Sequence, residues 1–194
     1  ARAACVISVT KALDEEVLRA TGSGNALAAT VKVGARSDGT ITAIQARLVY
    51  DAGAFPGAPL SSAIRRVYSH YRTPNLKIDA YDVVTNKPHI ASYRAPGATS
   101  TNFALETVVD ELGELLNIDP LEFRIRNVSR TGDPMPDGVT LSSVGIVDVL
   151  EQVKRHPCWT TPLNGANRGR GIGIGLWTMP GGSTSCHINL GDDG

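Results

Sequence analysis

Apolar and polar positions alternate along two neighbouring stretches of the chain, and this alternation predicts a pair of half-buried strands. The apolar positions are Leu27, Ala29, Val31 and Val33 in the first stretch, and Ile44, Ala46, Leu48 and Tyr50 in the second. Asp38-Gly39 lies between them and is typical of a hairpin turn. The small residues from Asp51 to Ala54 indicate that another backbone segment approaches closely where the second strand ends.

A period of three and four residues predicts an amphipathic helix after residue 100. Its apolar stripe comprises Leu105, Val108, Val109, Leu112, Leu115 and Leu116. Ser100 or Thr101 is the expected N-cap, because a hydroxyl oxygen can accept from the first free N–H groups of a helix. A second helix is predicted to begin at Pro120, where Asp119 suits the N-cap and Glu122 completes a capping box.

Other segments carry weaker patterns. Strands are expected at residues 5–9, 76–84, 169–178 and 185–190, and helices at residues 11–20, 61–71 and 142–156. Arg65 and Arg66, on the helix at 61–71, are expected to be solvated. Together the elements predict an α+β fold in which antiparallel β-hairpins pack with helices.

The charges of the chain balance, since its 194 residues include 19 basic and 19 acidic side chains for a net charge of +0. This balance argues against a nucleic-acid-binding protein, which would carry a basic excess. No apolar run approaches the roughly 18 residues of a membrane span. Cys5, Cys158 and Cys186 form no CxxC pair, and the four histidines show no metal-ligand spacing. We therefore expect no metal ligands and no iron–sulfur cluster within this chain.

Arg94, Ala95, Pro96 and Gly97 are the candidate binding residues, just before the first predicted helix. Pro96 fixes its own φ and pushes Ala95 towards an extended shape, while Gly97 tolerates a positive φ. A sharp turn results, with a guanidinium at its entrance. Free N–H groups and the positive end of the helix dipole would then favour a phosphate or oxyanion. The plainer interpretation is that Arg94 pairs with a nearby carboxylate and Pro-Gly is only a turn.

Several motifs follow one another at a consistent spacing. They are Val31-Lys32-Val33-Gly34 with Asp38-Gly39, Asp51-Ala52-Gly53-Ala54, residues 71–75, residues 93–97 followed by Phe103, Ala104 and Glu106, and Asp119-Pro120 followed by Glu122, Arg124 and Asn127. In this order they resemble the molybdenum hydroxylases, the family of xanthine dehydrogenases and aldehyde oxidoreductases. Ala95-Pro96 and Ser62 differ from the residues of the purine-oxidising enzymes, and this favours the aldehyde-oxidising branch.

The resemblance implies a molybdopterin cofactor with molybdenum, in bacteria often as the cytosine dinucleotide, beside residues 94–97. It implies partners: the rest of the same subunit, iron–sulfur and FAD subunits or domains, and a small-molecule substrate with an aldehyde or N-heterocycle carbon. The family's general-base glutamate is expected beyond Gly194, so no catalytic residue is assigned here. Glu106 is expected to be a structural hydrogen-bond acceptor, and Arg124 and Asn127 are expected to bond to neighbouring backbone.

The resemblance also implies a domain organisation. Residues 1–130 would be part of a first molybdopterin-binding domain, residues 131–168 a linker with one helix, and residues 169–194 the opening strands of a second such domain. The first residues lack the pattern of a signal peptide. We therefore expect a fragment of a larger cytoplasmic subunit, inactive alone, with export of the folded complex to the periplasm as an alternative. A free-standing, non-catalytic cofactor-binding or scaffold module is the alternative function.

Overall fold

The computed structural model describes residues 3–11, 26–90, 94–176 and 183–188, and of residues 3–11 it describes the backbone alone. Its strands are β1 (Ala3–Lys11), β2 (Leu27–Ala35), β3 (Ile41–Gly53) and β4 (Leu76–Val84). Its helices are α1 (Leu60–Tyr68), α2 (Ala98–Leu115), α3 (Pro120–Asn127), α4 (Ile146–Arg155) and α5 (Pro157–Thr160). Apart from Lys11, which ends β1, the helix expected at 11–20 lies outside the described residues.

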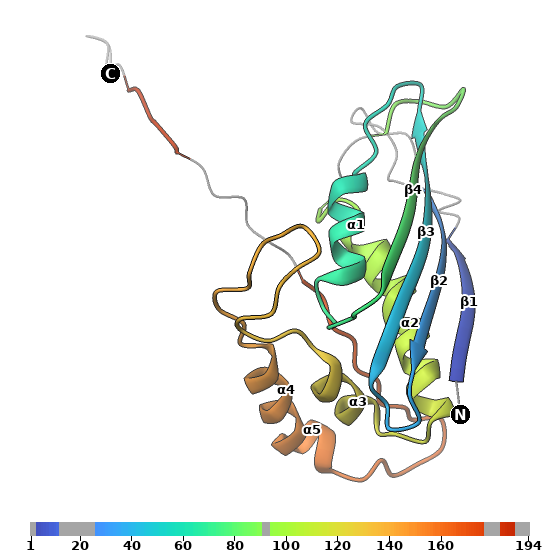
Figure 1. Ribbon diagram of the computed structural model, residues 1–194, viewed down its shortest axis with the longest axis vertical. Coiled ribbons are helices and arrows are strands. Elements are labelled where there is room, and N and C mark those ends of the chain that lie inside the picture. Colours follow the sequence, from blue (N-terminus) through green and yellow to red (C-terminus); the bar gives the residue numbers. More distant parts are fainter. Residues whose placement is uncertain (1–2, 12–25, 91–93, 177–182, 189–194) are drawn as a thin grey trace.

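The four strands form one sheet in the order β1-β2-β3-β4 (Figure 1). The predicted hairpin is confirmed: Val33 of β2 lies opposite Ile44 of β3 in an antiparallel pair, and Gly39 in the turn has a φ of +86°. The α+β fold class is confirmed as well. The strand expected at 76–84 is formed as β4, and its pairing, for which no prediction was made, is parallel to β3. The reason is that α1 carries the chain back along the sheet before β4 begins, as a parallel connection requires.

Helices α1 and α2 cover one face of the sheet (Figure 1). The apolar side chains of β2 and β3 share one buried core with those of the two helices. The alternation predicted for β2 appears directly in its burial, since every second residue from Leu27 to Ala35 is buried. On α2, most of the predicted stripe is buried, but Leu115 is 67% exposed. Leu115 is the last residue of α2, and the chain turns away at Asn117, which has a φ of +53°. The prediction that Leu115 is buried was therefore wrong.

The expectation that Arg66 is solvated was also wrong, because its side chain is buried at 2% exposure. Ala63, Arg66 and Val67 follow the i, i+3, i+4 spacing of one helix face, and this is the face that α1 turns into the protein. Burial lowers the pKa of the Arg66 guanidinium. Arg65, its neighbour, is about half exposed and pairs with Asp137 at 3.1 Å.

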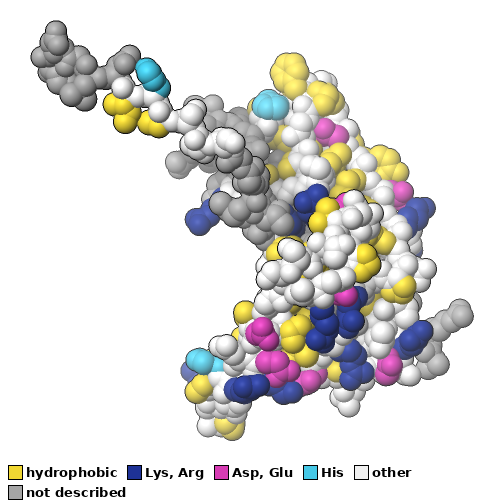
Figure 2. Space-filling model, turned by 60° about the vertical axis from the view of Figure 1, so that its left-hand side comes forward, with side chains coloured by type: hydrophobic (Ala, Val, Ile, Leu, Met, Phe, Trp, Pro, Cys, Tyr) yellow, Lys and Arg dark blue, Asp and Glu magenta, His cyan; other side chains and the backbone are white. Residues whose placement is uncertain are grey.

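The short helices α3, α4 and α5 form a group at one end of the sheet, where acidic and basic side chains also gather (Figure 2). The expectation of one helix in residues 131–168 was incomplete, because α4 is followed directly by α5. The strand expected at 169–178 is not formed in residues 169–176, and residues 183–188 form no strand either. A strand needs a neighbouring strand to which its backbone hydrogen-bonds, and neither segment has such a neighbouring strand among the described residues. None of the described helices is long and apolar enough to cross a membrane.

Candidate functional site

The candidate loop makes a tight turn directly before α2. The Ala98 N–H donates to the Ala95 carbonyl at 3.0 Å, with Pro96 and Gly97 between them, and Gly97 has a φ of +72°. Proline at the second position and a positive-φ glycine at the third are typical of a type II turn. The predicted sharp turn is therefore confirmed.

Ala95 does not have the extended shape that the following proline predicts, because its φ is +55°. The other non-glycine residues with positive φ in the described ranges are Asn117 and Asn167, and asparagine tolerates this conformation better than alanine. A conformation of this kind in alanine persists only where surrounding contacts impose it, and such residues cluster at functional sites. Ala95, with its unusual backbone angle, thus lies in the loop that the sequence analysis identified as the candidate binding site.

Gly97 packs against the first turn of α1. A Cβ atom at this position would lie 2.8 Å from the Pro59 carbonyl oxygen and 3.2 Å from the Ala63 nitrogen. The loop is therefore pressed against α1, and only glycine fits at its last position.

Gly97 is also the N-cap of α2, so the prediction of Ser100 or Thr101 as the cap was wrong. The left-handed turn starts the helix earlier than the hydroxyl residues would. Both hydroxyls instead contact the Tyr50 hydroxyl, Thr101 Oγ1 at 3.3 Å and Ser100 Oγ at 3.5 Å. The Tyr50 hydroxyl also lies 3.3 Å from the Gly97 carbonyl oxygen, to which it can donate. Tyr50 was predicted only as a core residue of β3, and its hydroxyl is the contact that the sequence analysis missed.

We expect Tyr50→Phe to lower the free energy of unfolding by about 1 kcal/mol, because the buried Gly97 carbonyl and Thr101 hydroxyl lose a shared partner. Urea denaturation followed by circular dichroism measures the change. Tyr81→Phe is the matched control, because Tyr81 is 47% exposed on the opposite face of the sheet. Equal effects of the two substitutions would show that the Tyr50 hydroxyl does not hold the loop.

The N-terminus of α2 has the features of an anion site. It has no side-chain cap, and no acidic residue lies in its first turn. Arg94 is exposed and has no carboxylate within ion-pair distance among the described residues, so the plainer interpretation of Arg94 is not supported in this part of the chain. Uncapped N–H groups, the positive end of the helix dipole and an unpaired guanidinium all favour a bound anion.

The segment that leads into the loop is tied to the end of β3. Asp51 accepts hydrogen bonds from Lys87 Nζ and Thr85 Oγ1, both at 2.6 Å, and from the Gly53 N–H at 3.0 Å. Partial burial raises the pKa of Asp51, but the hydrogen bonds from Lys87, Thr85 and Gly53 lower it to about 2. At Gly53, a Cβ atom would lie 2.1 Å from the Pro88 carbonyl oxygen. This confirms the predicted close approach of another backbone segment.

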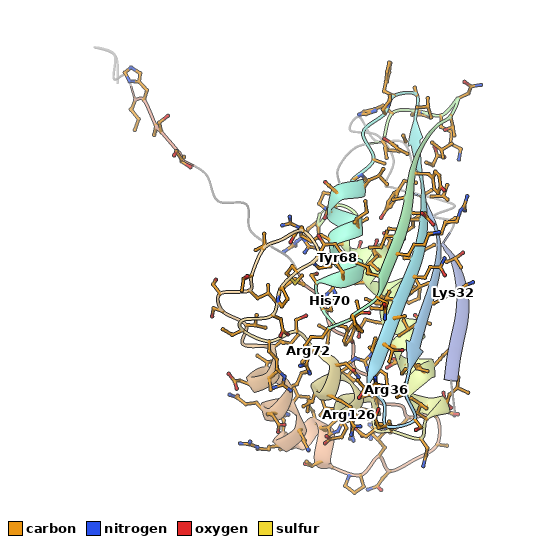
Figure 3. All side chains as sticks on the ribbon, viewed as in Figure 1. Lys32, Arg36, Tyr68, His70, Arg72 and Arg126 are labelled. Atoms are coloured by element: carbon orange, nitrogen blue, oxygen red, sulfur yellow. The ribbon has the colours of Figure 1, made fainter. Side chains whose placement is uncertain are left out.

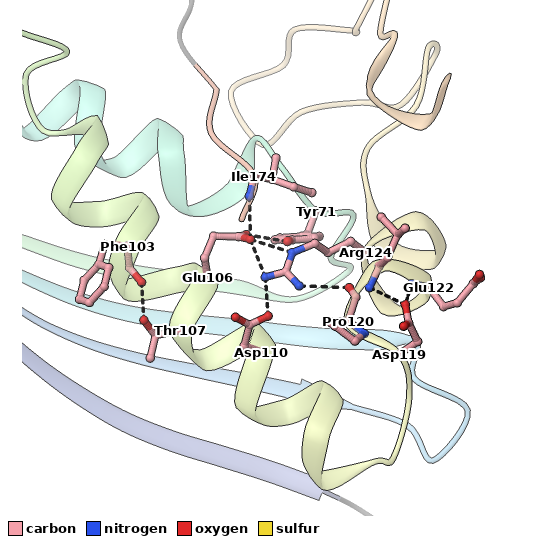
Figure 4. Close-up of polar contacts among 11 residues, drawn as sticks. Tyr71, Phe103, Glu106, Thr107, Asp110, Asp119, Pro120, Glu122, Arg124 and Ile174 are labelled. Carbon is pink, nitrogen blue, oxygen red and sulfur yellow. Dashed lines mark hydrogen bonds and ion pairs between the residues drawn. The ribbon is translucent and has the colours of Figure 1, made fainter. Parts of the chain in front are cut away.

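Further along α2, Glu106 is the centre of a buried polar network (Figure 4). Its Oε1 accepts from the Tyr71 hydroxyl at 2.6 Å, and its Oε2 accepts from Arg124 Nε and from the Ile174 N–H, both at 2.9 Å. Arg124 Nη2 also lies 2.8 Å from Glu106 Oε2 and 2.7 Å from Asp110 Oδ1, in positions that make ion pairs and not aligned hydrogen bonds. The predicted role of Glu106 as a structural acceptor is therefore confirmed.

The arginine and tyrosine of this network are deeply buried. Arg124 is 0% and Tyr71 1% exposed. Burial raises the pKa of Tyr71, and the charge of Glu106 raises it further. The hydroxyl therefore stays protonated and donates a hydrogen bond to Glu106. The expectation that Arg124 bonds only to backbone was incomplete: it donates to the Pro120 carbonyl, but its main partners are carboxylates.

Helix α3 places Arg124 and Asn127. Asp119 caps the helix as predicted, accepting from the Leu121 and Glu122 N–H groups at 2.9 and 3.1 Å. Glu122 does not complete the expected capping box in the described structure, because its carboxylate pairs with Lys154 of α4. Asn127 bonds to backbone as predicted, accepting from the Ile41 N–H and donating to the Gly39 and Phe123 carbonyls, each at 2.8 Å.

Residues 7–128 of the chain match the family described as "Molybdopterin cofactor-binding domain". The chain is 30% identical over 172 residues to a probable xanthine dehydrogenase subunit of Bacillus subtilis, and the alignment covers 80% of this chain and 23% of the relative. It is 31% identical over 127 residues to the nicotinate dehydrogenase large molybdopterin subunit of Eubacterium barkeri, covering 63% of this chain and 30% of the relative.

Among solved structures, the chain resembles the aldehyde oxidoreductase of Desulfovibrio gigas with a TM-score of 0.62 and 29% identity. That alignment covers 69% of this chain and 15% of the other. The chain thus spans less than a third of the length of each of these relatives.

Proposed function

This chain belongs to the molybdopterin cofactor-binding domain family, and on that premise we propose that it is part of the catalytic subunit of a molybdenum-dependent oxidoreductase. The proposed reaction is hydroxylation of an aldehyde or N-heterocycle carbon. Its support is the match over residues 7–128 together with relatives named aldehyde oxidoreductase, xanthine dehydrogenase and nicotinate dehydrogenase. Ala95-Pro96 in the loop favours an aldehyde as the substrate.

The residues of the loop fit an anionic pterin cofactor. Gly97 holds the tight turn against α1, the N-terminus of α2 has no side-chain cap, and Arg94 is exposed and unpaired within the described residues. We assign cofactor binding to Arg94, Ala95, Pro96 and Gly97. The guanidinium of Arg94 would donate to an oxyanion of the cofactor, and the backbone of the other three would shape the turn beneath it. When bound, the cofactor supplies the redox centre at which the carbon is hydroxylated.

We assign no catalytic role to the other described residues of this chain. Tyr50 holds the Gly97 carbonyl, and Glu106 is occupied by three donors, one of which is the buried Arg124, so it is not free to take a proton from substrate. We therefore propose that the catalytic base is supplied by the rest of the subunit.

The domain organisation is part of the same proposal. Residues 1–130 would belong to a first molybdopterin-binding domain, residues 131–168 to a helical linker, and residues 169–194 to the start of a second domain. Electrons would leave through iron–sulfur and FAD domains or subunits. The match at residues 7–128 supports the first boundary, because it ends within three residues of the proposed domain end.

Loss of cofactor on removal of one guanidinium tests the site. In the subunit purified with its partners, we expect Arg94→Ala to weaken cofactor retention about tenfold or more, since a hydrogen bond to a charged group contributes about 1.5–3 kcal/mol. Molybdenum content per protein after dialysis is the readout. Arg168→Ala is the matched control, because Arg168 is also exposed but lies outside the loop. Equal molybdenum contents in the two variants would contradict the assignment of Arg94.

A further inference from the structure

A cleft lies at the C-terminal end of α1, whereas the Arg94–Gly97 loop packs against the first turn of this helix. Its volume is about 690 Å³, and none of residues 94–97 lines it. Its walls come from the β2–β3 hairpin, the end of α1, the end of α3 and the loop at residues 133–136. Small-molecule sites have volumes of about 300–1,000 Å³, so the cleft has room for a ligand of ordinary size.

Three arginines lie around this cleft, namely Arg36, Arg72 and Arg126 (Figure 3). Arg72 is already engaged, because it donates to the Arg126 carbonyl at 2.9 Å and lies 3.9 Å from Asp133. Arg36 and Arg126 are exposed, and neither has a carboxylate within ion-pair distance in the ranges that the structure describes. Two guanidiniums are therefore available to a ligand.

Arg36 and Arg126 come from different elements, the β2–β3 hairpin and α3, yet both line the same cleft. The charged residues that line it are three arginines and one carboxylate, Asp133, so positive charge is in excess.

Between these charges the wall is apolar. Pro74, Leu76 and Met135 line it and are at least partly exposed, whereas Ile41 and Tyr71 are only 2% and 1% exposed and contribute little surface. A mostly apolar pocket with a few charged groups at one side fixes the orientation of a ligand that has an apolar body and one charged end. Arginine suits a carboxylate, because its planar fork can donate two parallel hydrogen bonds.

We propose that this cleft binds a small organic carboxylate, with its charged end at Arg36 and Arg126 and its apolar body against Pro74, Leu76 and Met135. The site is separate from the candidate cofactor loop, and the proposal does not depend on the function of that loop. Its ligand is an aromatic or branched aliphatic acid, because most of the surface that lines the cleft is apolar.

Benzoate and its neutral analogue benzamide test the proposal with the full 194-residue chain. We expect saturable binding of benzoate with a Kd below about 10 mM, which is ordinary for a ligand of this size. Benzamide has the same ring without the charge and should bind at least about tenfold more weakly. Two-dimensional NMR titration measures both affinities and identifies the residues that shift. Absence of benzoate binding to the wild-type chain, or equal affinity for benzoate and benzamide, would overturn the proposal.

Variants test the assigned residues. The double variant Arg36→Gln/Arg126→Gln should weaken benzoate binding at least about tenfold, since both charge-assisted hydrogen bonds are lost. Arg155→Gln/Arg168→Gln is the matched control, because it removes the same charge from exposed positions that do not line the cleft. A similar loss in the control would mean non-specific attraction to a positive surface, and that result would also overturn the proposal.

Discussion

Glu106→Ala should lower the free energy of unfolding by about 3–5 kcal/mol, the cost of breaking a buried ion pair by removal of one partner. Arg124 is fully buried, and among the described residues its only remaining carboxylate would be Asp110, whose side chain is 48% exposed. The Tyr71 hydroxyl and the Ile174 N–H would lose their acceptor in the same step. Urea denaturation of the 194-residue chain measures the change, provided that the slope with denaturant stays constant.

Two further variants separate charge from hydrogen bonding at this position. Glu106→Gln keeps an acceptor oxygen but removes the charge, so its effect should fall between those of wild type and Glu106→Ala. Glu114→Ala is the matched control, because Glu114 is an exposed carboxylate on the same helix and its removal should change stability by less than about 0.5 kcal/mol. If Glu106→Ala costs no more than Glu114→Ala, the network does not stabilise the fold.

The network matters for the candidate site because of what it connects. Glu106 lies on α2, the helix that Gly97 caps, and its partners come from α3, from Tyr71 after α1 and from Ile174. Helix α2 is thus fixed in its middle by Glu106 and at its first turn by Tyr50. The position of the loop relative to the sheet follows from these two attachments.

Gly53→Ala should cost about 3 kcal/mol or more, for two reasons that add. The φ of Gly53 is +69°, which an alanine adopts only with strain of about 1–2 kcal/mol. The new Cβ would also lie 2.1 Å from the Pro88 carbonyl oxygen, which is backbone and cannot move aside as a flexible side chain can. Overpacking of this kind typically costs about 1–3 kcal/mol. Thermal and urea denaturation measure the sum.

Gly132→Ala isolates the contribution of the backbone angle. Gly132 has a φ of +89°, but nothing lies within 4 Å of the position of a new Cβ. This control should therefore cost only the strain of about 1–2 kcal/mol. If Gly53→Ala and Gly132→Ala are equally destabilising, the close approach of Pro88 has no energetic consequence and the segment at 85–90 is not pressed against β3.

Local sequence patterns predicted a large part of the fold. The period-2 alternation placed β2 and β3 and assigned their buried faces, because a strand with one buried face has only one workable register. Asp119-Pro120 predicted the start of α3, since a capped N-terminus needs only the residues next to it. The same was true of the Pro96-Gly97 turn and of the close approach at Gly53. In the candidate site, the sequence singled out the loop and recognised Glu106 as an acceptor.

What the sequence could not predict depends on residues far apart in the chain. The sequence analysis did not predict the parallel pairing of β4, the burial of Arg66 or the positive φ of Ala95. Tyr50 reaches Gly97 across 47 residues, and Ile174 reaches Glu106 across 68. Arg36 and Arg126, from the β2–β3 hairpin and α3, likewise line one cleft although they are far apart in the sequence. The sequence by itself determined which short segments become strands, turns and helices, because backbone preferences and capping act over a few residues. Only the tertiary structure decided which charges are buried, paired or left free, because burial and Coulomb interactions depend on distances in space and not on separation along the chain.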